Sequence, residues 1–581
     1  MRGFFTTLGT IWGLAFPYFR SEDRWPGRIL LASVIAIELG LVGIDVLINQ
    51  WNARFFNAIQ EYNWDAFVSE LLYFCVLAAI FIVLAVYQLY LNQWLQIRWR
   101  RWMTIRYLGH WLDHSNHYRM QLLGDAADNP DQRIADDIRM FIERTLYIGV
   151  NVLSSIVSFA SFVVILWGLS AMAPLHLFGA DWAIPGYLVW AALIYAVLGT
   201  LLTHLIGRPL IGLNFNQQRF EADFRFNLVR TRENSEQIAL LHGEPAEQTR
   251  LMDRFGAVVG NWLLIMTRTK RLTFLTAGYN QASVVFPYVV VSPAYFAHHI
   301  QLGGLTQTAH AFVSVQRALS VFITIYQQFA EWRAVIERLS GFDKSVAVGE
   351  AAARTPPVIR VISAGKRERL ALEALEVRLP TGAPLVGADR LAFGSEDRVL
   401  VTGPSGSGKS TLFRAIGGIW PFGSGEIAVP EGARVMVLPQ RPYLPIGSLE
   451  AAIAYPAEPG TFDAGEVREV LQAVGLAALA PRLYEDAHWN RMLSPGEQQR
   501  LGLARAILHA PDYLFLDEAT ASLDEPAEAA LYRLLQQRLA HSSIVSIGHR
   551  STLRAFHRRH FTLGRDGERQ KVREVALEAA E

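Results

Sequence analysis

Six long apolar stretches constrain this chain more than any other feature of its sequence. A helix needs about 20 apolar residues to cross the hydrocarbon core of a bilayer. The candidate stretches lie near residues 28–49, 66–92, 145–171, 183–206, 272–297 and 308–330. Hydrophobic residues make up 51% of the 581 residues, more than an ordinary soluble protein carries. The sequence therefore predicts a membrane domain of six spanning helices, surrounded by membrane lipid.

The charges beside these stretches predict their orientation. The connections 172–182 and 298–307 contain no Lys or Arg, and 50–65 contains only Arg54. Arginines instead flank the other ends of the first two spans: Arg2, Arg20, Arg24, Arg28, Arg98, Arg100, Arg101 and Arg106. Because basic residues collect in cytoplasmic loops, both termini of this multi-pass protein are predicted to be cytoplasmic.

Overall charge and cysteine usage exclude several other classes of function. The chain has 54 basic and 53 acidic residues, so no charge bias points to nucleic acid as a partner. Its single cysteine, Cys75, excludes an intrachain disulfide and a multi-cysteine metal site.

Changes of pattern along the chain predict three parts. Residues 1–345 form the membrane domain, in which polar insertions at about 93–144 and 207–271 continue the spans as cytoplasmic helical arms. Residues 346–368 read as a linker, and 369–581 alternate short strands with helices, which is typical of an α/β domain.

A phosphate-binding loop, the Walker A pattern, lies in the third part. Residues 403–410 read Gly-Pro-Ser-Gly-Ser-Gly-Lys-Ser and follow the predicted strand 398–402. In such a loop the backbone amides surround phosphate oxygens, the lysine reaches the terminal phosphates and the final serine offers its hydroxyl to Mg²⁺. The predicted nucleotide-binding residues are Gly403, Pro404, Ser405, Gly406, Ser407, Gly408, Lys409, Ser410 and Thr411.

Two carboxylates follow a second apolar strand, Tyr513-Leu-Phe-Leu-Asp517-Glu518. Transfer of a phosphoryl group to water needs a ligand for Mg²⁺ and a group that orients the attacking water. Asp517 fits the first task and Glu518 the second. ATP and Mg²⁺ are therefore the expected cofactors.

Three further motifs complete a series: Leu493-Ser-Pro-Gly-Glu-Gln-Gln-Arg500, Gln440 after the strand 435–438, and His549 after the strand 543–547. In this order and spacing they resemble the signature, Q-loop and H-loop of the ATP-binding cassette (ABC) family. The resemblance covers the whole chain and implies a six-helix transmembrane domain of the exporter-like fold, fused to a cytoplasmic α/β ATPase.

The resemblance also implies roles for single residues. Ser494 and Gly496 would contact the γ-phosphate bound by a second copy of the domain, and Asp524 would communicate across that dimer. Gln440 would sense Mg²⁺ and the membrane arms, and His549 would hold the γ-phosphate. Together with Lys409 and Glu518 these residues would form the hydrolytic site.

Three positions depart from the family pattern. Pro495 replaces the usual glycine of the signature and removes one backbone N–H. Leu379 stands where the family usually stacks an aromatic ring on adenine, which suggests loose base selectivity. Ala521-Ser522 reverses the common order before Asp524.

The chain contains one phosphate loop and one signature, while each ATP site of the family uses the loop of one domain and the signature of another. A homodimer is therefore expected.

Charge-rich segments in the two arms, 129–137 and 221–225 with 232–234 and 243–244, resemble a particular branch of the family. This branch joins the peroxisomal fatty-acyl transporters to bacterial BacA/SbmA-related peptide-uptake proteins, here with a fused ATPase domain, and segment 51–59 is similar to its bacterial side. The resemblance implies a bacterial inner membrane protein. The alternative is that these charges only form solvated helix faces.

Polar residues inside the spans predict a cargo pathway. Arg317, Ser320, Thr324 and Gln327 recur at helical spacing in the last span, and Glu38, Asp45 and Glu70 add ionisable groups near membrane depth. A polar stripe is costly against lipid, so it lines a wet cavity or forms hydrogen bonds between helices; both readings stay open.

These observations lead to one leading hypothesis for the function and two alternatives. We expect ATP-driven uptake of bulky hydrophilic cargo such as peptides, peptide antibiotics or corrinoids. Export or flipping of a fatty-acyl or lipid substrate is the second hypothesis, and a proton-driven carrier or channel with a regulatory ATPase domain is the third. The complete set Lys409, Asp517, Glu518 and His549 argues against the third.

Overall fold

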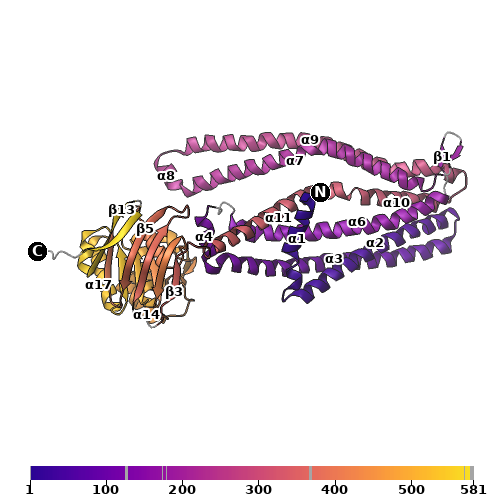
Figure 1. The fold of residues 1–581 in the computed structure, drawn as a ribbon. Helices are drawn as coiled ribbons and strands as arrows, with labels where there is room; N and C mark the ends of the chain where they lie inside the picture. The colour runs from indigo at the N-terminus through magenta and orange to yellow at the C-terminus, as the bar shows by residue number, and fades with distance from the viewer. Residues whose placement is uncertain are drawn as a thin grey trace. The chain divides into compact units, whose positions relative to one another are not determined.

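The computed structural model describes residues 2–124, 129–172, 175–177, 180–182, 184–365, 369–567 and 569–575. The chain forms two compact units (Figure 1). The first contains residues 1–108 and 130–341, and the second contains 109–129 and 342–581.

The first unit is built from long helices. Their bounds are α1 (Arg2–Ala15), η1 (Tyr18–Arg20), α2 (Arg24–Gln60), α3 (Trp64–Leu112), α5 (Pro130–Gln132), a π-turn η3 (Arg133–Asp137), α6 (Ile138–Met172), α7 (Tyr187–Glu233), α8 (Ser235–Leu240), α9 (Glu244–Phe296), α10 (Leu302–Leu319) and α11 (Val321–Ala352). A short antiparallel hairpin joins α6 to α7, with strands β1 (Leu175–Leu177) and β2 (Ala180–Trp182).

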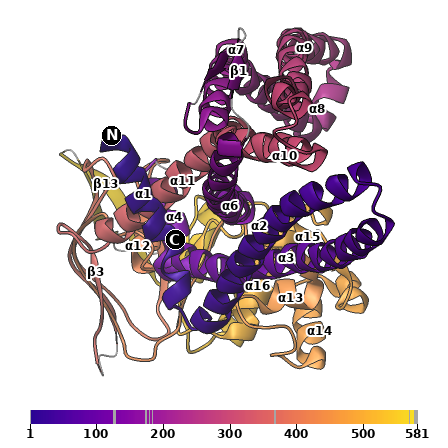
Figure 2. The ribbon, with the colours of Figure 1, turned by 90° about the vertical axis from the view of Figure 1, so that its right-hand side faces the viewer.

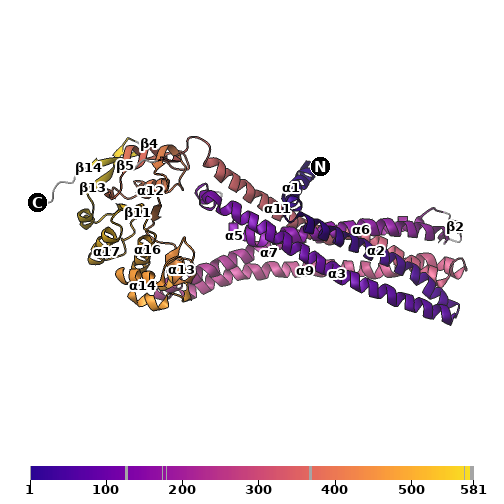
Figure 3. The same ribbon diagram turned by 90° about the horizontal axis from the view of Figure 1, so that it is seen from below.

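These helices associate in pairs around α10. Helices α7 and α9 run side by side, with α8 at their shared end (Figures 1 and 3). Helices α2 and α3 form a second pair, joined by hydrogen bonds from Trp51 Nε1 to the Glu70 carbonyl and from Gln88 Nε2 to Glu38 Oε2, and their ribbons lie next to each other in Figure 2. Helix α10 packs on α2, α6, α7 and α9, and fully buried Phe312 and Val315 are part of that contact.

Four stretches of the described chain are long and apolar enough to cross a membrane: Arg24–Gln60, Trp64–Leu122, Pro130–Met172 and Tyr187–Glu233. They contain the first three predicted spans and residues 187–206 of the fourth. The predicted fifth span, 272–297, is helical up to Phe296, where α9 ends. Both predicted arms are largely helical as well, being continuations of α3, α6, α7 and α9.

The predicted sixth span, 308–330, needs a correction because it is not one continuous helix. Helix α10 ends at Leu319 and α11 begins at Val321. Between them the Ser320 N–H donates to the carbonyls of both Gln316 and Arg317, at 3.0 and 3.2 Å, which tightens the last turn and interrupts the helix. The predicted stripe is therefore divided between two helices, and the side chains of Thr324 and Gln327 lie outside the described part.

The two charge-rich arm segments differ. Asp137 is fully buried and binds two arginines, with its carboxylate 2.5 Å from Arg133 Nη1 and 2.6 Å from Arg338 Nη2. The segment 129–137 is therefore more than a solvated helix face, because the ion pair between Asp137 and Arg338 joins it to α11. The segment around Arg232 is exposed and fits the solvated reading.

The second unit is built on a 10-stranded sheet with the order β3-β7-β4-β5-β14-β13-β6-β12-β11-β8. The strands are β3 (Arg360–Ser363), β4 (Leu370–Arg378), β5 (Pro384–Phe393), β6 (Arg398–Thr402), β7 (Gly423–Val429), β8 (Val435–Leu438), β11 (Tyr513–Asp517), β12 (Ser543–Ile547), β13 (Arg559–Asp566) and β14 (Arg569–Val575). The neighbours β13, β6, β12, β11 and β8 are parallel. A separate two-stranded ribbon pairs β9 (Gly447–Ser448) with β10 (Asp486–Ala487).

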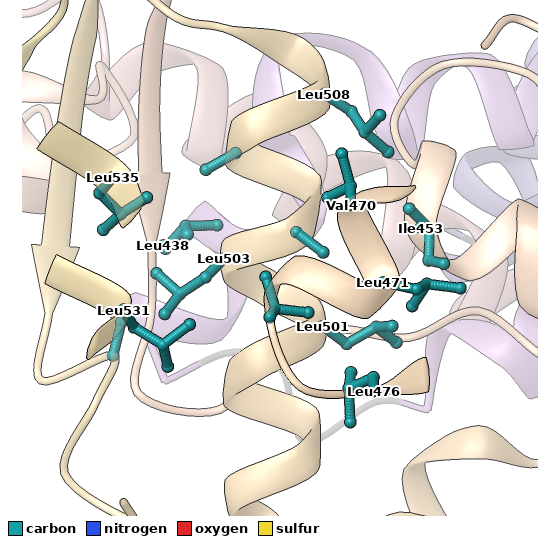
Figure 4. Packing of buried hydrophobic residues seen from close by; sticks show 14 of the residues in the cluster. Leu438, Ile453, Val470, Leu471, Leu476, Leu501, Leu503, Leu508, Leu531 and Leu535 are labelled. Atoms are coloured by element: carbon teal, nitrogen blue, oxygen red, sulfur yellow. The ribbon is translucent and has the colours of Figure 1, made fainter. Parts of the chain in front are cut away.

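Helices cover this sheet and its flanks. They are α12 (Lys409–Ile416), α13 (Leu449–Ala454), α14 (Ala464–Ala473), η4 (Ala477–Arg482), α15 (Trp489–Met492), α16 (Pro495–His509), α17 (Glu525–Arg538) and η5 (Ser551–Phe556). The largest apolar cluster surrounds α16, where Leu501 and Leu503 have no exposed surface (Figure 4).

Part of the first predicted arm belongs to this unit. After a break at η2 (Asp113–Ser115), where His114 and Ser115 have φ of 47° and 60°, the short helix α4 (Asn116–Leu122) begins. Tyr118 and Leu122 pack against the apolar core of the sheet. Asn116 is fully buried and donates to Glu350 Oε1 at 3.4 Å.

The predicted linker 346–368 contains regular structure. Helix α11 continues to Ala352, and strand β3 pairs with β7. Residues 366–368 lie outside the described part. The domain bounds themselves stay a prediction.

Candidate nucleotide and hydrolysis site

The predicted site residues lie at one edge of the parallel strands. The phosphate loop follows β6, Asp517 ends β11, His549 comes two residues after β12, and Gln440 comes two residues after β8. Since neighbouring parallel strands end at the same edge, four segments far apart in sequence meet there. In such sheets ligands bind outside the carboxyl ends of the strands.

Glycines give the phosphate loop its shape. Gly403, Gly406 and Gly408 have φ of 153°, 74° and 90°, in the region that favours glycine. A Cβ added at Gly408 would lie 2.5 Å from Val386 Cγ2, so no other residue fits there without a shift. A Cβ at Gly406 would meet nothing within 4 Å, which leaves open space beside the loop for a phosphate.

Two side chains of the loop suit anion binding. Lys409 is buried, and its Nζ donates to the carbonyls of Gly403 and Pro404 at 2.8 and 2.9 Å. Burial lowers the pKa of this ammonium group. Ser407 Oγ is buried and makes no hydrogen bond within the described protein, so its hydroxyl is available to a phosphate oxygen.

A hydroxyl and a carboxylate meet where a divalent cation would bind. Ser410 Oγ donates to Asp517 Oδ1 at 2.8 Å. Burial, the largest cause, raises the pKa of Asp517. Mg²⁺ prefers oxygen ligands of this kind beside nucleotide phosphates, so the donor set fits the predicted ion.

Glu518 has a strained backbone. Its φ is 51°, which is unusual for a residue with a side chain. Its Oε1 lies 3.2 Å from His549 Nε2, so the predicted base and the predicted phosphate ligand are in contact. Strain of this kind is often found where a side chain must be aimed for function.

The signature residues begin α16. Ser494 is the N-cap residue: its Oγ accepts from the Glu497 N–H at 3.3 Å, and Glu497 Oε2 accepts from the Ser494 N–H at 2.8 Å. Pro495 occupies the first helical position, where an amide has no partner within the helix. The replacement therefore costs the helix nothing. Gly496 follows in the first turn.

The remaining predicted residues lie at the surface around this edge. Asp524 is the N-cap of α17, and its Oδ1 accepts from the Ala527 N–H at 2.9 Å. Gln440 is exposed, and Leu379 after β4 is 38% exposed. The predicted pathway residues belong to the other unit: Arg317 is exposed on α10 and Ser320 is half-buried.

Sequence reasoning missed two residues beside the site. Gln499 is buried in the signature helix, although its motif was recognised. Arg550 follows His549, and its Nη1 donates to the Leu523 carbonyl at 2.7 Å, which fixes the segment before Asp524. Neither role can be read from spacing, because the partners are backbone atoms of distant segments.

Comparison with known proteins agrees with this geometry. Residues 14–296 match the family model "ABC transporter transmembrane region 2", and residues 389–521 match the model "ABC transporter". The inner membrane ABC transporter ATP-binding protein YddA of Escherichia coli is 34% identical over 92% of this chain and 93% of its own length. The chain belongs to the ABC transporter family.

Two further similarities place this ABC transporter within the family. The human lysosomal cobalamin transporter ABCD4 is 25% identical over 80% of this chain and 79% of its own. The structure of a bacterial Atm1-family ABC exporter with ATP bound matches with a TM-score of 0.70 at 16% identity, covering 94% of each chain. The predicted branch and the exporter-like fold with an α/β ATPase domain are thereby confirmed. The protein is a membrane transporter that couples ATP hydrolysis to transport.

Proposed function

We propose that this ABC transporter works as a homodimer with two composite ATP sites. The observation that carries the proposal is the arrangement of the motifs. One chain supplies one phosphate loop and one signature, and the Ser494 end of α16 is exposed. Contact of Ser494 and Gly496 with the γ-phosphate held by a second chain would complete each site.

Within each site the residues of one chain divide the work. The loop amides, Ser407 and Lys409 would hold the phosphates, and Ser410, Asp517 and Gln440 would hold Mg²⁺. Glu518 accepts the proton of the attacking water, while His549 binds the γ-phosphate and orients Glu518. When bound, Mg²⁺ would supply positive charge beside the phosphate oxygens.

Mixed dimers test this assembly. Subunits that carry Lys409→Ala and Ser494→Arg are each expected to be inactive as homodimers. In the mixed dimer both lesions fall in one site and the other site is intact, so about half of the activity of the wild-type dimer should return. An inactive mixed dimer, or an active monomer by light scattering, would contradict the composite site.

We further propose uptake of a bulky hydrophilic cargo across a bacterial inner membrane, with both termini cytoplasmic. A cluster of polar residues between α2 and α10 supports the proposal. Asp45 Oδ1 lies 3.7 Å from His310 Nε2, and fully buried Asn49 donates to the Gln307 carbonyl at 3.0 Å. Asn49 Nδ2 also lies 3.1 Å from His310 Nδ1.

Arg317 extends this polar cluster along α10. It stands seven residues after His310 on the same helix, about two helical turns away. Ionisable groups at membrane depth normally face a cavity or a partner rather than lipid. A pathway with both signs of charge suits a zwitterionic peptide or a corrinoid better than an acyl chain.

Uptake into vesicles of defined orientation distinguishes the candidate cargoes. Labelled peptide, corrinoid and acyl-CoA are compared side by side, with and without ATP. Arg317→Leu should reduce uptake of the hydrophilic cargo and leave basal ATP hydrolysis intact, because the hydrolysis site lies in the other unit. The matched control is Arg333→Leu, an exposed arginine on α11 that pairs with Glu337.

The opposite result would support the second candidate, an acyl or lipid exporter. Movement of the acyl substrate that is lost in Arg317→Leu, with peptide and corrinoid uptake unchanged, would show that the pathway serves the apolar cargo. The similarity to the human lysosomal cobalamin transporter favours a corrinoid over a peptide as the cargo.

A further inference from the structure

Gln499 joins three segments of the hydrolysis site to the signature helix. Its Nε2 donates to the carbonyl of Gln440 at 3.0 Å and to the carbonyl of Glu518 at 3.4 Å. Its Oε1 accepts from the N–H of Ser522 at 2.8 Å. One side chain thus contacts the segment after β8, the segment after β11 and the segment that leads to Asp524.

The chemistry of the amide suits this position. A glutamine side chain has two N–H donors and one carbonyl acceptor, and here two backbone carbonyls and one backbone N–H face it. The Gln499 side chain is buried, with 3% of its surface exposed, and the three bonds are partly buried. Loss of the amide would remove a partner from three partly buried backbone groups, which is costly.

The Glu518 contact has a particular consequence for catalysis. A residue with φ of 51° keeps that conformation only where the surrounding structure holds it. The Glu518 N–H donates to the Ile547 carbonyl at 3.3 Å, and its carbonyl accepts from Gln499. Gln499 thus fixes one side of the peptide that aims the Glu518 carboxylate.

Helix α16 links this contact to the signature. Gln499 lies five residues after Ser494, about 7.5 Å along the helix. Leu501 and Leu503 are fully buried in the apolar cluster (Figure 4). The Ser494–Glu497 cap orders the first turn. Movement at Ser494 therefore reaches Gln499 through a packed helix instead of a loop.

We propose that Gln499 is a positioning residue that holds the Glu518 and Gln440 peptides in place against the signature helix of the same chain. This inference rests on the proposed homodimer. Ser494 contacts the nucleotide bound to the partner, while Glu518 and Gln440 serve the nucleotide bound to their own chain. Loss of Gln499 should therefore impair the ATP site that uses Glu518 of the same chain and spare the other site.

Steady-state hydrolysis gives the first test. Gln499→Leu should reduce kcat about 100-fold, as expected when a catalytic group is displaced by about 1 Å. The affinity for ATP should change less than about threefold, because the phosphate loop is untouched. Gln499→Glu keeps the acceptor for Ser522 and loses the donors, so it serves if the leucine variant folds poorly. Gln537→Leu, an exposed position on α17, is the matched control.

Mixed dimers separate positioning from general damage to α16. The reference is the mixed dimer of a Lys409→Ala chain and a Ser494→Arg chain, whose surviving site uses Glu518 of the Ser494→Arg chain. When Gln499→Leu is added to the Ser494→Arg chain, activity should fall about 100-fold below that of the reference. When it is added to the Lys409→Ala chain, activity should match that of the reference.

Equal losses in the two arrangements would overturn the proposal, because they would show a structural defect of the signature helix. A Gln499→Leu homodimer with normal kcat would overturn it as well. If the reference mixed dimer is inactive, the composite site fails, and kcat and ATP affinity of the Gln499→Glu homodimer still decide whether Gln499 positions Glu518.

Discussion

Replacing Glu518 by glutamine separates proton transfer from every other property of the hydrolysis site. Both residues pay the same cost for φ of 51°, and the glutamine carbonyl can still accept from His549, which lies 3.2 Å from Glu518 Oε1. Lys409, Ser410 and Asp517 are unchanged. What is lost is the basicity of the carboxylate, and general base catalysis contributes about 10²–10⁴ in rate, or about 2.7–5.4 kcal/mol of the activation barrier.

The assay is phosphate release by purified, detergent-solubilised protein, together with a separate measurement of ATP binding. We expect normal binding and a rate reduced by that factor, while Glu525→Gln on the exposed first turn of α17 behaves as wild type. Glu518→Gly adds a second comparison: it relieves the left-handed backbone, so it should be at least as stable as wild type and equally inactive. Near-normal hydrolysis by Glu518→Gln would refute the assignment of Glu518 as the base.

Two further predictions concern the stability of the second unit, here called the ATPase unit (residues 109–129 and 342–581), and one concerns the first unit, here called the membrane unit. Leu501→Ala removes a fully buried side chain of the α16 cluster and should destabilise this unit by about 2–5 kcal/mol, seen by calorimetry as a lower unfolding temperature. Burial lowers the pKa of His557 from its ordinary value of 6.5 to about 4, so the unfolded state binds the proton more tightly. The unit should therefore lose stability as the pH falls from about 6.5 towards 4. His557→Gln should flatten this pH dependence. An unchanged slope would contradict the assignment of the pH dependence to His557. In the membrane unit, Asp45→Asn should reduce uptake of hydrophilic cargo without changing basal ATP hydrolysis, and unchanged uptake would remove the Asp45–His310 pair from the pathway.

Strong local patterns made much of the fold predictable. Long apolar runs predicted membrane helices, and alternating short strands and helices predicted the α/β domain. The phosphate loop, the strand ending in Asp517 and Glu518, and the residues Gln440 and His549 could be found because each follows a recognisable strand. The exact pairing of those strands was not predictable, since hydrogen bonds between distant segments leave no period in the sequence.

The sixth span shows where pattern reasoning fails. Arg317 and Ser320 have helical spacing, which predicts one continuous stripe, yet the N–H of Ser320 bonds to both Gln316 and Arg317 and ends α10. Hydropathy over a window of residues does not register one altered turn. Likewise, the spacing of charges in 129–137 could not show that Asp137 is buried between Arg133 and Arg338.

The sequence by itself determined the class of protein, a membrane protein with an ATPase domain. Membrane helices, one phosphate loop and one signature can be recognised because they depend on residue types at short, fixed separations. Only the tertiary structure decided which distant atoms meet. It placed α4 of the first arm in the ATPase unit, where Tyr118 and Leu122 cover the sheet core. It also placed the Gln499 amide between three backbone segments. Such contacts depend on how the chain packs in space, and the partners of the Gln499 amide are main-chain atoms that every residue type carries.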